Sequence, residues 1–215
     1  MVGNKNKTVR YTLLYVFATI VLLIMIYPYM YMIFNSFAPW DQVDKRFIPT
    51  TFTLRSYKWL FLGSKDTVPR PWLRAFFNSV IVTACSTFLM MIIAMLVSYV
   101  LSKVQFRGKK FLKNLVLFQM FYPAIILLIP IFLIIRKLGI YDTYLGMILP
   151  KAVSLWAIFL YTNFFMGIPN EVIEAAKIDG ASDLRIVFKI IVPMAKSITT
   201  IIFLFLVMDR WTELM

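Results

Sequence analysis

Long hydrophobic runs without charge alternate with short basic segments along the 215-residue chain. A run close to or above roughly 18 to 20 apolar residues can cross the hydrocarbon core of a bilayer as a helix. Backbone groups in lipid must be satisfied internally, and barrel strands would be shorter and alternating, so these runs predict helices. The pattern predicts an all-α polytopic membrane protein with five transmembrane helices, at about residues 11–34, 77–101, 112–135, 146–167 and 191–209.

Prolines and lysines interrupt some of these runs. Pro123 and Pro130 fall in the third run, and each removes one backbone donor, which predicts a kink or break. Prolines are also commoner in transmembrane helices than in soluble ones, so an ordinary helix and a helix bent around a pathway are equal alternatives. Lys151 in the fourth run and Lys196 in the fifth can extend their ammonium groups to the lipid headgroups.

Composition and charge support a membrane protein. Hydrophobic residues make up 61% of the chain, and the formal net charge is +13. The basic residues lie between the spans, so phospholipid headgroups explain them better than nucleic acid. The chain has no histidine, which removes the commonest metal ligand, and we expect no metal site. The single cysteine, Cys85, lies inside a span, so the chain can form no internal disulfide.

The basic residues also predict the orientation of the chain. Lys5, Lys7 and Arg10 precede the first span, and five further basic residues fill the link at 103–113. The positive-inside rule places both segments in the cytoplasm. The long segment at 35–76, which would then be extracellular, is itself basic and opposes this assignment, but the reverse orientation places both shorter clusters outside.

This orientation divides the chain into successive segments. We expect a cytoplasmic basic N-terminus at 1–10, a first transmembrane helix at 11–34, an extracellular segment at 35–76, a transmembrane core at 77–209 with a cytoplasmic loop at 168–190, and the start of an outer loop at 210–215.

The cytoplasmic loop contains a compact polar stretch, Glu174 to Ser182, between the fourth and fifth spans. Asn170 can cap a first short helix, and Glu171 in its first turn favours the positive end of the helix dipole. This helix is expected to run to about Ile178 or Asp179, where Gly180 can take the left-handed conformation that ends a helix.

A second short helix is expected after the glycine. Ser182 or Asp183 can cap it, and it would run from about Leu184 to Val192. Pro193 then marks the junction with the last span. The two helices form a helix–turn–helix along the membrane surface, which is a suitable shape for transmitting a movement.

The polar stretch also has features of a docking site. Ala175 and Ala176 have small side chains, so a partner can approach the backbone closely. Glu174 and Asp179 supply acceptors for a partner's Arg or Lys. The string alone could arise by chance, since most of its residues are common in helices. Its position between two spans, on the inner side, is an independent requirement, and the sequence meets it.

The segment from Phe165 to Pro193, FMGIPNEVIEAAKIDGASDLRIVFKIIVP, closely resembles the cytoplasmic loop of permease subunits of bacterial ABC importers. Further similar stretches indicate the maltose-type carbohydrate permeases, in the shorter of their two subunit types. These stretches are FTLRSYKWLF at 52–61, FFNSV at 76–80, SYVLSKVQFRGKK at 98–110 and IPIFLIIRKLGIYDTYLGMILP at 129–150.

The resemblance implies a transport mechanism with several partners. Two permease subunits form the path, a cytoplasmic ATPase dimer lies beneath, and an extracellular solute-binding protein delivers the carbohydrate, with an oligosaccharide as the expected cargo. The sequence has no P-loop motif, so ATP and Mg²⁺ are expected on the ATPase and no cofactor on this chain. The resemblance further implies that the ATPase docks on Glu174, Ala175, Ala176, Asp179 and Gly180.

The resemblance also covers localisation and the end of the chain. It implies the bacterial plasma membrane. The stretch DRWTELM at 209–215 is similar to a family stretch after which members continue into a further helix, so that helix is expected to be missing here.

The substrate path has weaker candidates. Pro123 could bend a helix around it, and Trp156 and Phe159 could stack on sugar faces, although packing or lipid contact explains most aromatic residues in spans. A non-sugar solute, or an ATP-independent secondary transporter or channel, are the alternative functions. An enzyme is not expected, because no span core carries a catalytic cluster.

Overall fold

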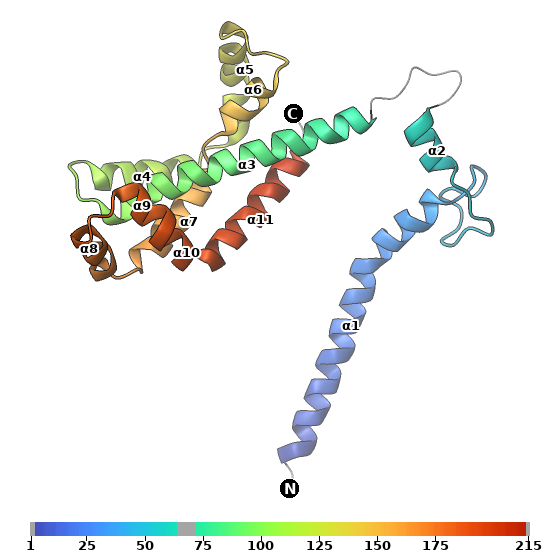
Figure 1. Cartoon of the computed structure of the whole chain (residues 1–215). Coiled ribbons are helices and arrows are strands. Elements are labelled where there is room, and N and C mark those ends of the chain that lie inside the picture. The colour runs from blue at the N-terminus through green and yellow to red at the C-terminus, as the bar shows by residue number, and fades with distance from the viewer. Residues whose placement is uncertain (1–2, 64–71, 214–215) are drawn as a thin grey trace. The chain divides into compact units, whose positions relative to one another are not determined.

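The computed structural model describes residues 3–63 and 72–213, and the regular structure in these residues is helical (Figure 1). The predictions for residues 1–2, 64–71 and 214–215, which belong to the N-terminal, extracellular and C-terminal segments, lie outside the described residues. The chain divides into two compact units between Ala75 and Phe76. Each unit is described by itself.

The first unit contains α1 (Gly3–Ser36) and α2 (Arg55–Leu62). Helix α1 starts well before the predicted residue 11, because basic residues end an apolar run without ending a helix. After α1 the chain folds back on the end of this helix. The ring of Phe47 lies 5.1 Å from Tyr27 and 5.5 Å from Phe34. These aromatic contacts fix the loop that leads to α2.

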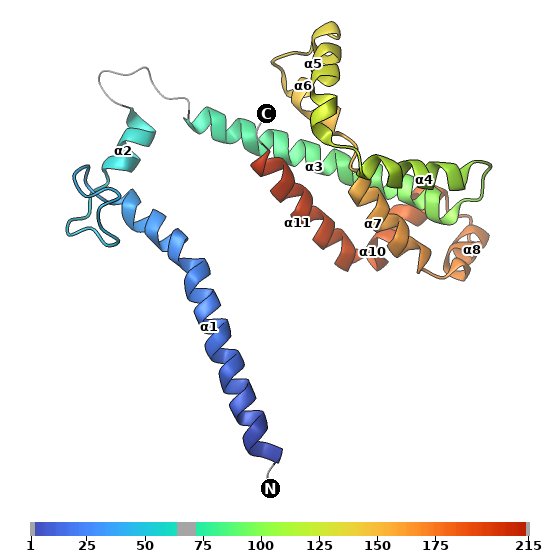
Figure 2. The ribbon, with the colours of Figure 1, turned by 180° about the vertical axis from the view of Figure 1, so that it is seen from behind.

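The second unit is built on α3 (Trp72–Lys103), whose first residues precede the boundary. Helices α7 (Leu155–Met166) and α11 (Lys196–Thr212) lie along it (Figure 2). Tyr161 of α7 and Ile202 of α11 are fully buried in the shared core. The core therefore lies where these three helices meet.

A polar contact reinforces the packing of α3 on α7. The buried Ser98 hydroxyl donates a hydrogen bond of 2.8 Å to the carbonyl oxygen of Ile158. A satisfied buried hydroxyl fixes the register between two helices, because any other register would leave it without a partner.

The third predicted span is broken. Helix α4 (Lys109–Met120) is followed by the 3₁₀ turn η1 (Ala124–Leu127) and by α5 (Leu128–Lys137), with a bend of 93° between the helical axes. Pro123 precedes η1 in an extended conformation and marks the break. Pro130 lies in the first turn of α5, where its missing N–H breaks no intrahelical bond. Of the two predicted interruptions, only Pro123 accompanies a bend.

The fourth predicted span is bent as well. It consists of α6 (Tyr144–Ile148), the 3₁₀ turn η2 (Leu149–Lys151) and α7, with a bend of 44°. The hydroxyl oxygen of Ser154 accepts a hydrogen bond of 3.3 Å from the Ala157 N–H and caps α7. Figure 1 shows α5 and α6 together, projecting from the rest of the unit.

The last segment begins with α8 (Asn170–Ile178) and α9 (Asp183–Ile186). A π turn, η3 (Val187–Ile191), and α10 (Val192–Met194) continue α9. The chain then bends by 89° into α11 at Ala195, whose backbone leaves the helical region. The predicted junction at Pro193 is thus two residues early, because a proline at the start of α10 continues the helix.

The number of spans follows from these breaks. Within the described residues, two helices are long and apolar enough to cross a membrane, at Lys7–Ser36 and Trp72–Lys103. The number rises to five if each of the three bent pairs is one span. Hydropathy therefore predicts the five apolar regions but not that three of them are interrupted.

Candidate functional site

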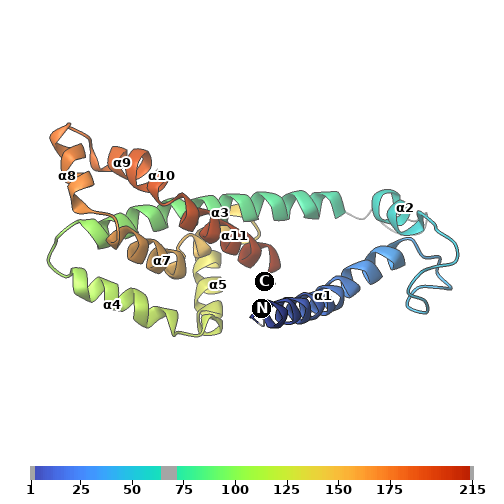
Figure 3. The ribbon, with the colours of Figure 1, turned by 90° about the horizontal axis from the view of Figure 1, so that it is seen from below.

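The polar stretch forms a small helical platform at the end of α3, seen with α8 and α9 together in Figure 3. The Lys103 ammonium donates to the carbonyl oxygen of Ile168 and, at 3.0 Å, to Asn170 Oδ1. The Tyr99 hydroxyl donates a hydrogen bond of 2.6 Å to Asp183 Oδ1. The last turn of α3 thus holds the starts of both α8 and α9.

These contacts correct one prediction and confirm another. Asn170 does not cap α8: the residue before the helix is Pro169, without a side-chain cap, and the Asn170 side chain instead accepts from Lys103. Ser182 caps α9, since its hydroxyl oxygen accepts from the Arg185 N–H at 3.4 Å.

The turn between α8 and α9 has the predicted chemistry. Gly180 has a φ of +75°, in the left-handed region that glycine adopts without strain. Its N–H bonds the Lys177 carbonyl at 3.0 Å, and the Ala181 N–H bonds the Ala176 carbonyl at 2.9 Å. These two bonds form a Schellman motif, which satisfies the last carbonyls of α8. The angle between α8 and α9 is therefore set by the backbone.

Helix α8 has a buried face and an exposed face. Ile173 and Ala176 are 6% and 7% exposed and belong to the core of the second unit. Glu174, Ala175, Asp179 and Gly180 are exposed. Of the predicted docking residues, Ala176 therefore packs within the chain, and the other four share the accessible side.

The exposed face includes an apolar residue that sequence reasoning missed. The Ile178 side chain is 87% exposed, and Leu184 on α9 is 61% exposed. A signal was available, because Ile178 lies two residues after Ala176 and so falls about 200° around the helix from it. We call the exposed set the coupling surface; it consists of Glu174, Ala175, Ile178, Asp179, Gly180 and Leu184.

The coupling surface carries charges of both signs at its edges. Lys177 and Asp183 form an exposed ion pair at 3.6 Å, and Arg185 is exposed nearby on α9. An apolar centre with a mixed polar rim is the composition of a protein–protein contact. The arrangement is suited to binding a partner.

The three candidates for the substrate path lie in two places. Pro123 lies at the break between α4 and α5, where it is exposed. Trp156 and Phe159 are half-buried on α7, three residues apart and hence on one side of that helix. The Trp156 ring lies 5.4 Å from Phe205 of α11, so it contributes to the packing of α7 on α11.

Comparison with known proteins gives a consistent match. Residues 60–215 match the family model described as the binding-protein-dependent transport system inner membrane component. The polygalacturonan/rhamnogalacturonan transport system permease protein YtcP of Bacillus subtilis (strain 168) is 37% identical over 94% of this chain and 69% of its own length. Protein LplC of the same organism is 33% identical over 88% of this chain and 63% of its own length.

A solved structure supports the same assignment. One chain of the crystal structure of a bacterial ABC transporter involved in the import of the acidic polysaccharide alginate superposes with a TM-score of 0.81 and 27% identity. The match covers 96% of this chain and 72% of that chain. The protein described here thus spans between about two thirds and three quarters of these relatives. On the match over residues 60–215, the chain belongs to the family of binding-protein-dependent transport system inner membrane components.

Proposed function

We propose that this chain is the permease subunit of an ATP-driven importer for a carbohydrate, with an oligosaccharide as its cargo. It would form half of the translocation path in a bacterial plasma membrane. Membership of the family and the carbohydrates named for its relatives support this function. The observation that carries it is the coupling surface, an exposed helical platform fixed by polar contacts to the end of a long apolar helix.

The proposal includes the partners of this subunit. A second permease subunit completes the path, a cytoplasmic ATPase dimer binds ATP and Mg²⁺, and an extracellular binding protein delivers the sugar. The N-terminus and the α8–α9 turn lie in the cytoplasm, as the basic link at 103–113 indicates.

The coupling surface would contact the ATPase in a defined way. Ile178 enters an apolar cleft of the partner, because burying so exposed a side chain supplies binding free energy. Glu174 and Asp179 accept hydrogen bonds from basic groups at the rim. Ala175 and Gly180 leave room for close approach. Ala176 holds α8 against the core, and so transmits the force without touching the partner.

Substitution of Ile178 tests this assignment. Burial of an isoleucine is worth about 1.5 to 3 kcal/mol, so Ile178→Glu should weaken the ATPase complex at least about tenfold. Co-purification of the ATPase in detergent measures the effect. Ile178→Val should retain the complex. Ile48→Glu, which places the same charge on an exposed isoleucine of the first unit, is the matched control.

Reconstitution tests the function as a whole. Vesicles with this chain, a second permease, the ATPase and the binding protein should take up oligosaccharide only when ATP is supplied inside the compartment that holds the ATPase. The chain alone should show no uptake. Sugar or ion flux through the isolated chain would instead favour a self-sufficient carrier or channel.

A further inference from the structure

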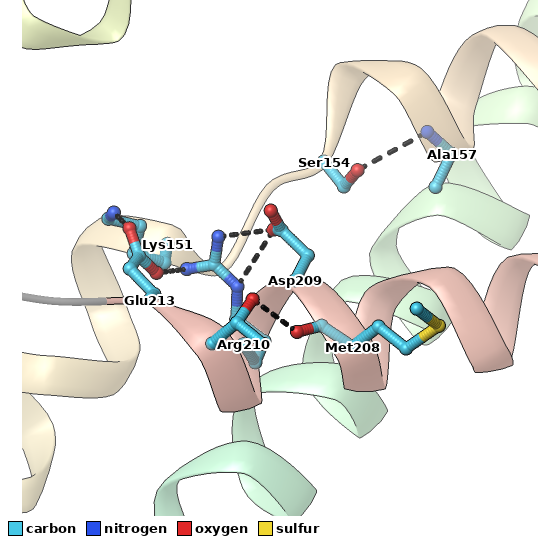
Figure 4. A network of polar contacts seen from close by, with 8 residues as sticks. Lys151, Ser154, Ala157, Met208, Asp209, Arg210 and Glu213 are labelled. Atoms are coloured by element: carbon cyan, nitrogen blue, oxygen red, sulfur yellow. Dashed lines mark hydrogen bonds and ion pairs between the residues drawn. The ribbon is translucent and has the colours of Figure 1, made fainter. Parts of the chain in front are cut away.

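Four charged side chains join the turn before α7 to the end of α11 (Figure 4). The Glu213 carboxylate pairs with Lys151 through one oxygen and with Arg210 through the other, and Arg210 also pairs with Asp209. The side chains of Arg210, Glu213 and Lys151 are 11%, 22% and 26% exposed. Lys151 thus pairs within the chain instead of extending to the headgroups as the sequence suggested.

The network is balanced in charge. Two cations face two anions, and the single carboxylate of Glu213 bridges both cations. Removal of Glu213 would leave Lys151 and Arg210 close together with one fewer anion, which is costly for partly buried groups. Because water still reaches all three, the pairs can also separate and become hydrated at modest cost.

The network lies far from the coupling surface. The rings of Phe76 and Trp211 lie 5.9 Å apart, which places the end of α11 beside the start of α3. The Tyr99–Asp183 hydrogen bond places α9 beside the other end of α3. From Phe76 to Tyr99 the helix rises by about 35 Å, at 1.5 Å per residue. The network and the coupling surface therefore occupy opposite ends of the second unit.

Between these ends, α7 and α11 are held by apolar packing. Tyr161, Ile202 and Leu206 are buried in the common core, and Trp156 packs on Phe205. A close-packed apolar interface resists separation, because each void costs dispersion contacts. The ionic end of the α7–α11 pair is therefore the end that can open.

We propose that the Lys151–Glu213–Arg210 network is a gate contact, closed in one conformation of the transport cycle and open in the other. The proposal rests on the proposed function. The chain runs from α8 through α9 and α10 into α11, so a displacement at the coupling surface reaches Glu213 along continuous elements. Each state of a two-state cycle requires contacts that the other lacks, and the network supplies such a contact for the closed state.

A reversible crosslink tests the gate. Cysteines replace Lys151 and Glu213 in a Cys85→Ser chain, and the complete transporter is treated with a short, reducible bis-methanethiosulfonate. Linking should lower sugar uptake at least about fivefold, the lower range of a functional coupling, and reduction should restore it. ATPase co-purification should not change. The two single-cysteine chains, treated identically, are the controls.

The results discriminate between a gate and a static contact. Uptake by the linked transporter at the unlinked rate would overturn the proposal, as would failure of the cysteines to link under any nucleotide condition. Absence of ATP-dependent uptake in the Cys85→Ser transporter itself would instead refute the proposed function.

A second measurement covers the case in which the cysteine pair is inactive. Glu213→Gln should raise sugar-independent ATP hydrolysis severalfold, because the closed state loses its contact, and Glu213→Asp should restore tighter coupling. A purely structural role would lower the amount of assembled transporter in both variants and leave the ATP used per sugar unchanged, which would overturn the proposal.

Discussion

Gly180 ends α8 in a conformation that an L-amino acid with a side chain adopts only with strain. Its φ is +75°, and a Cβ added there would meet no atom within 4 Å. Any cost of substitution therefore arises from the backbone. Gly180→Ala should destabilise the turn by about 1 to 2 kcal/mol, whereas Gly180→Asn should cost less because asparagine tolerates this region.

The measurement for Gly180 is co-purification of the ATPase together with thermal unfolding of the chain in detergent. The alanine variant should bind less ATPase than the asparagine variant at equal expression. Equal binding by both variants and the parent would show that the turn geometry does not matter for docking.

Two adjacent alanines show how far residue-level prediction reached. The sequence treats Ala175 and Ala176 as one docking pair, but successive helical residues point about 100° apart. Ala175 is exposed, whereas Ala176 joins Ile173 in the core. The motif therefore predicts the location of the surface, and only the phase of the helix decides which residues face outward. That phase could be inferred from Ile173 and Ala176, which are three residues apart.

At the scale of elements, hydropathy predicts the apolar regions because burial in lipid depends on composition. The breaks depend on local backbone geometry. Pro123 gave a signal for the α4–α5 break. The bend before α7 and the bend at Ala195 occur where the apolar character of the chain continues, so a hydropathy pattern contains no sign of them.

The attachment of α8 to α3 depends on Lys103. Its ammonium satisfies the carbonyl of Ile168 and the amide of Asn170, where α8 begins. Lys103→Met keeps the length of the side chain but removes both bonds, each worth about 0.5 to 1.5 kcal/mol. We expect α8 to detach more readily and the sugar transported per ATP to fall.

Limited proteolysis of the 165–185 region and transport assays check this prediction. Lys110→Met is the matched control, because Lys110 is an exposed lysine in the adjacent link. The assignment of Lys103 fails if both variants are cleaved and transport alike.

At the scale of the whole molecule, sidedness can be tested by labelling. After Cys85→Ser, a cysteine at the exposed Arg107 should react only from the cytoplasmic side, and a cysteine at the exposed Lys45 only from outside. The physical reason is the basic link at 103–113. An impermeant maleimide applied to intact cells and to inverted vesicles provides the measurement. Labelling of position 107 in intact cells would reverse the topology and move the coupling surface away from the ATPase.

The length of α3 has a consequence for the membrane around it. Its 32 residues rise about 48 Å, whereas the hydrocarbon core of a bilayer is about 30 Å thick. The helix must therefore tilt, project into the aqueous phase, or do both. Because Tyr99 and Lys103 are near one tip, the platform of α8 and α9 stands off from the lipid at a height set by bilayer thickness. Lipid chain length thereby becomes a physical variable of coupling, acting through hydrophobic mismatch.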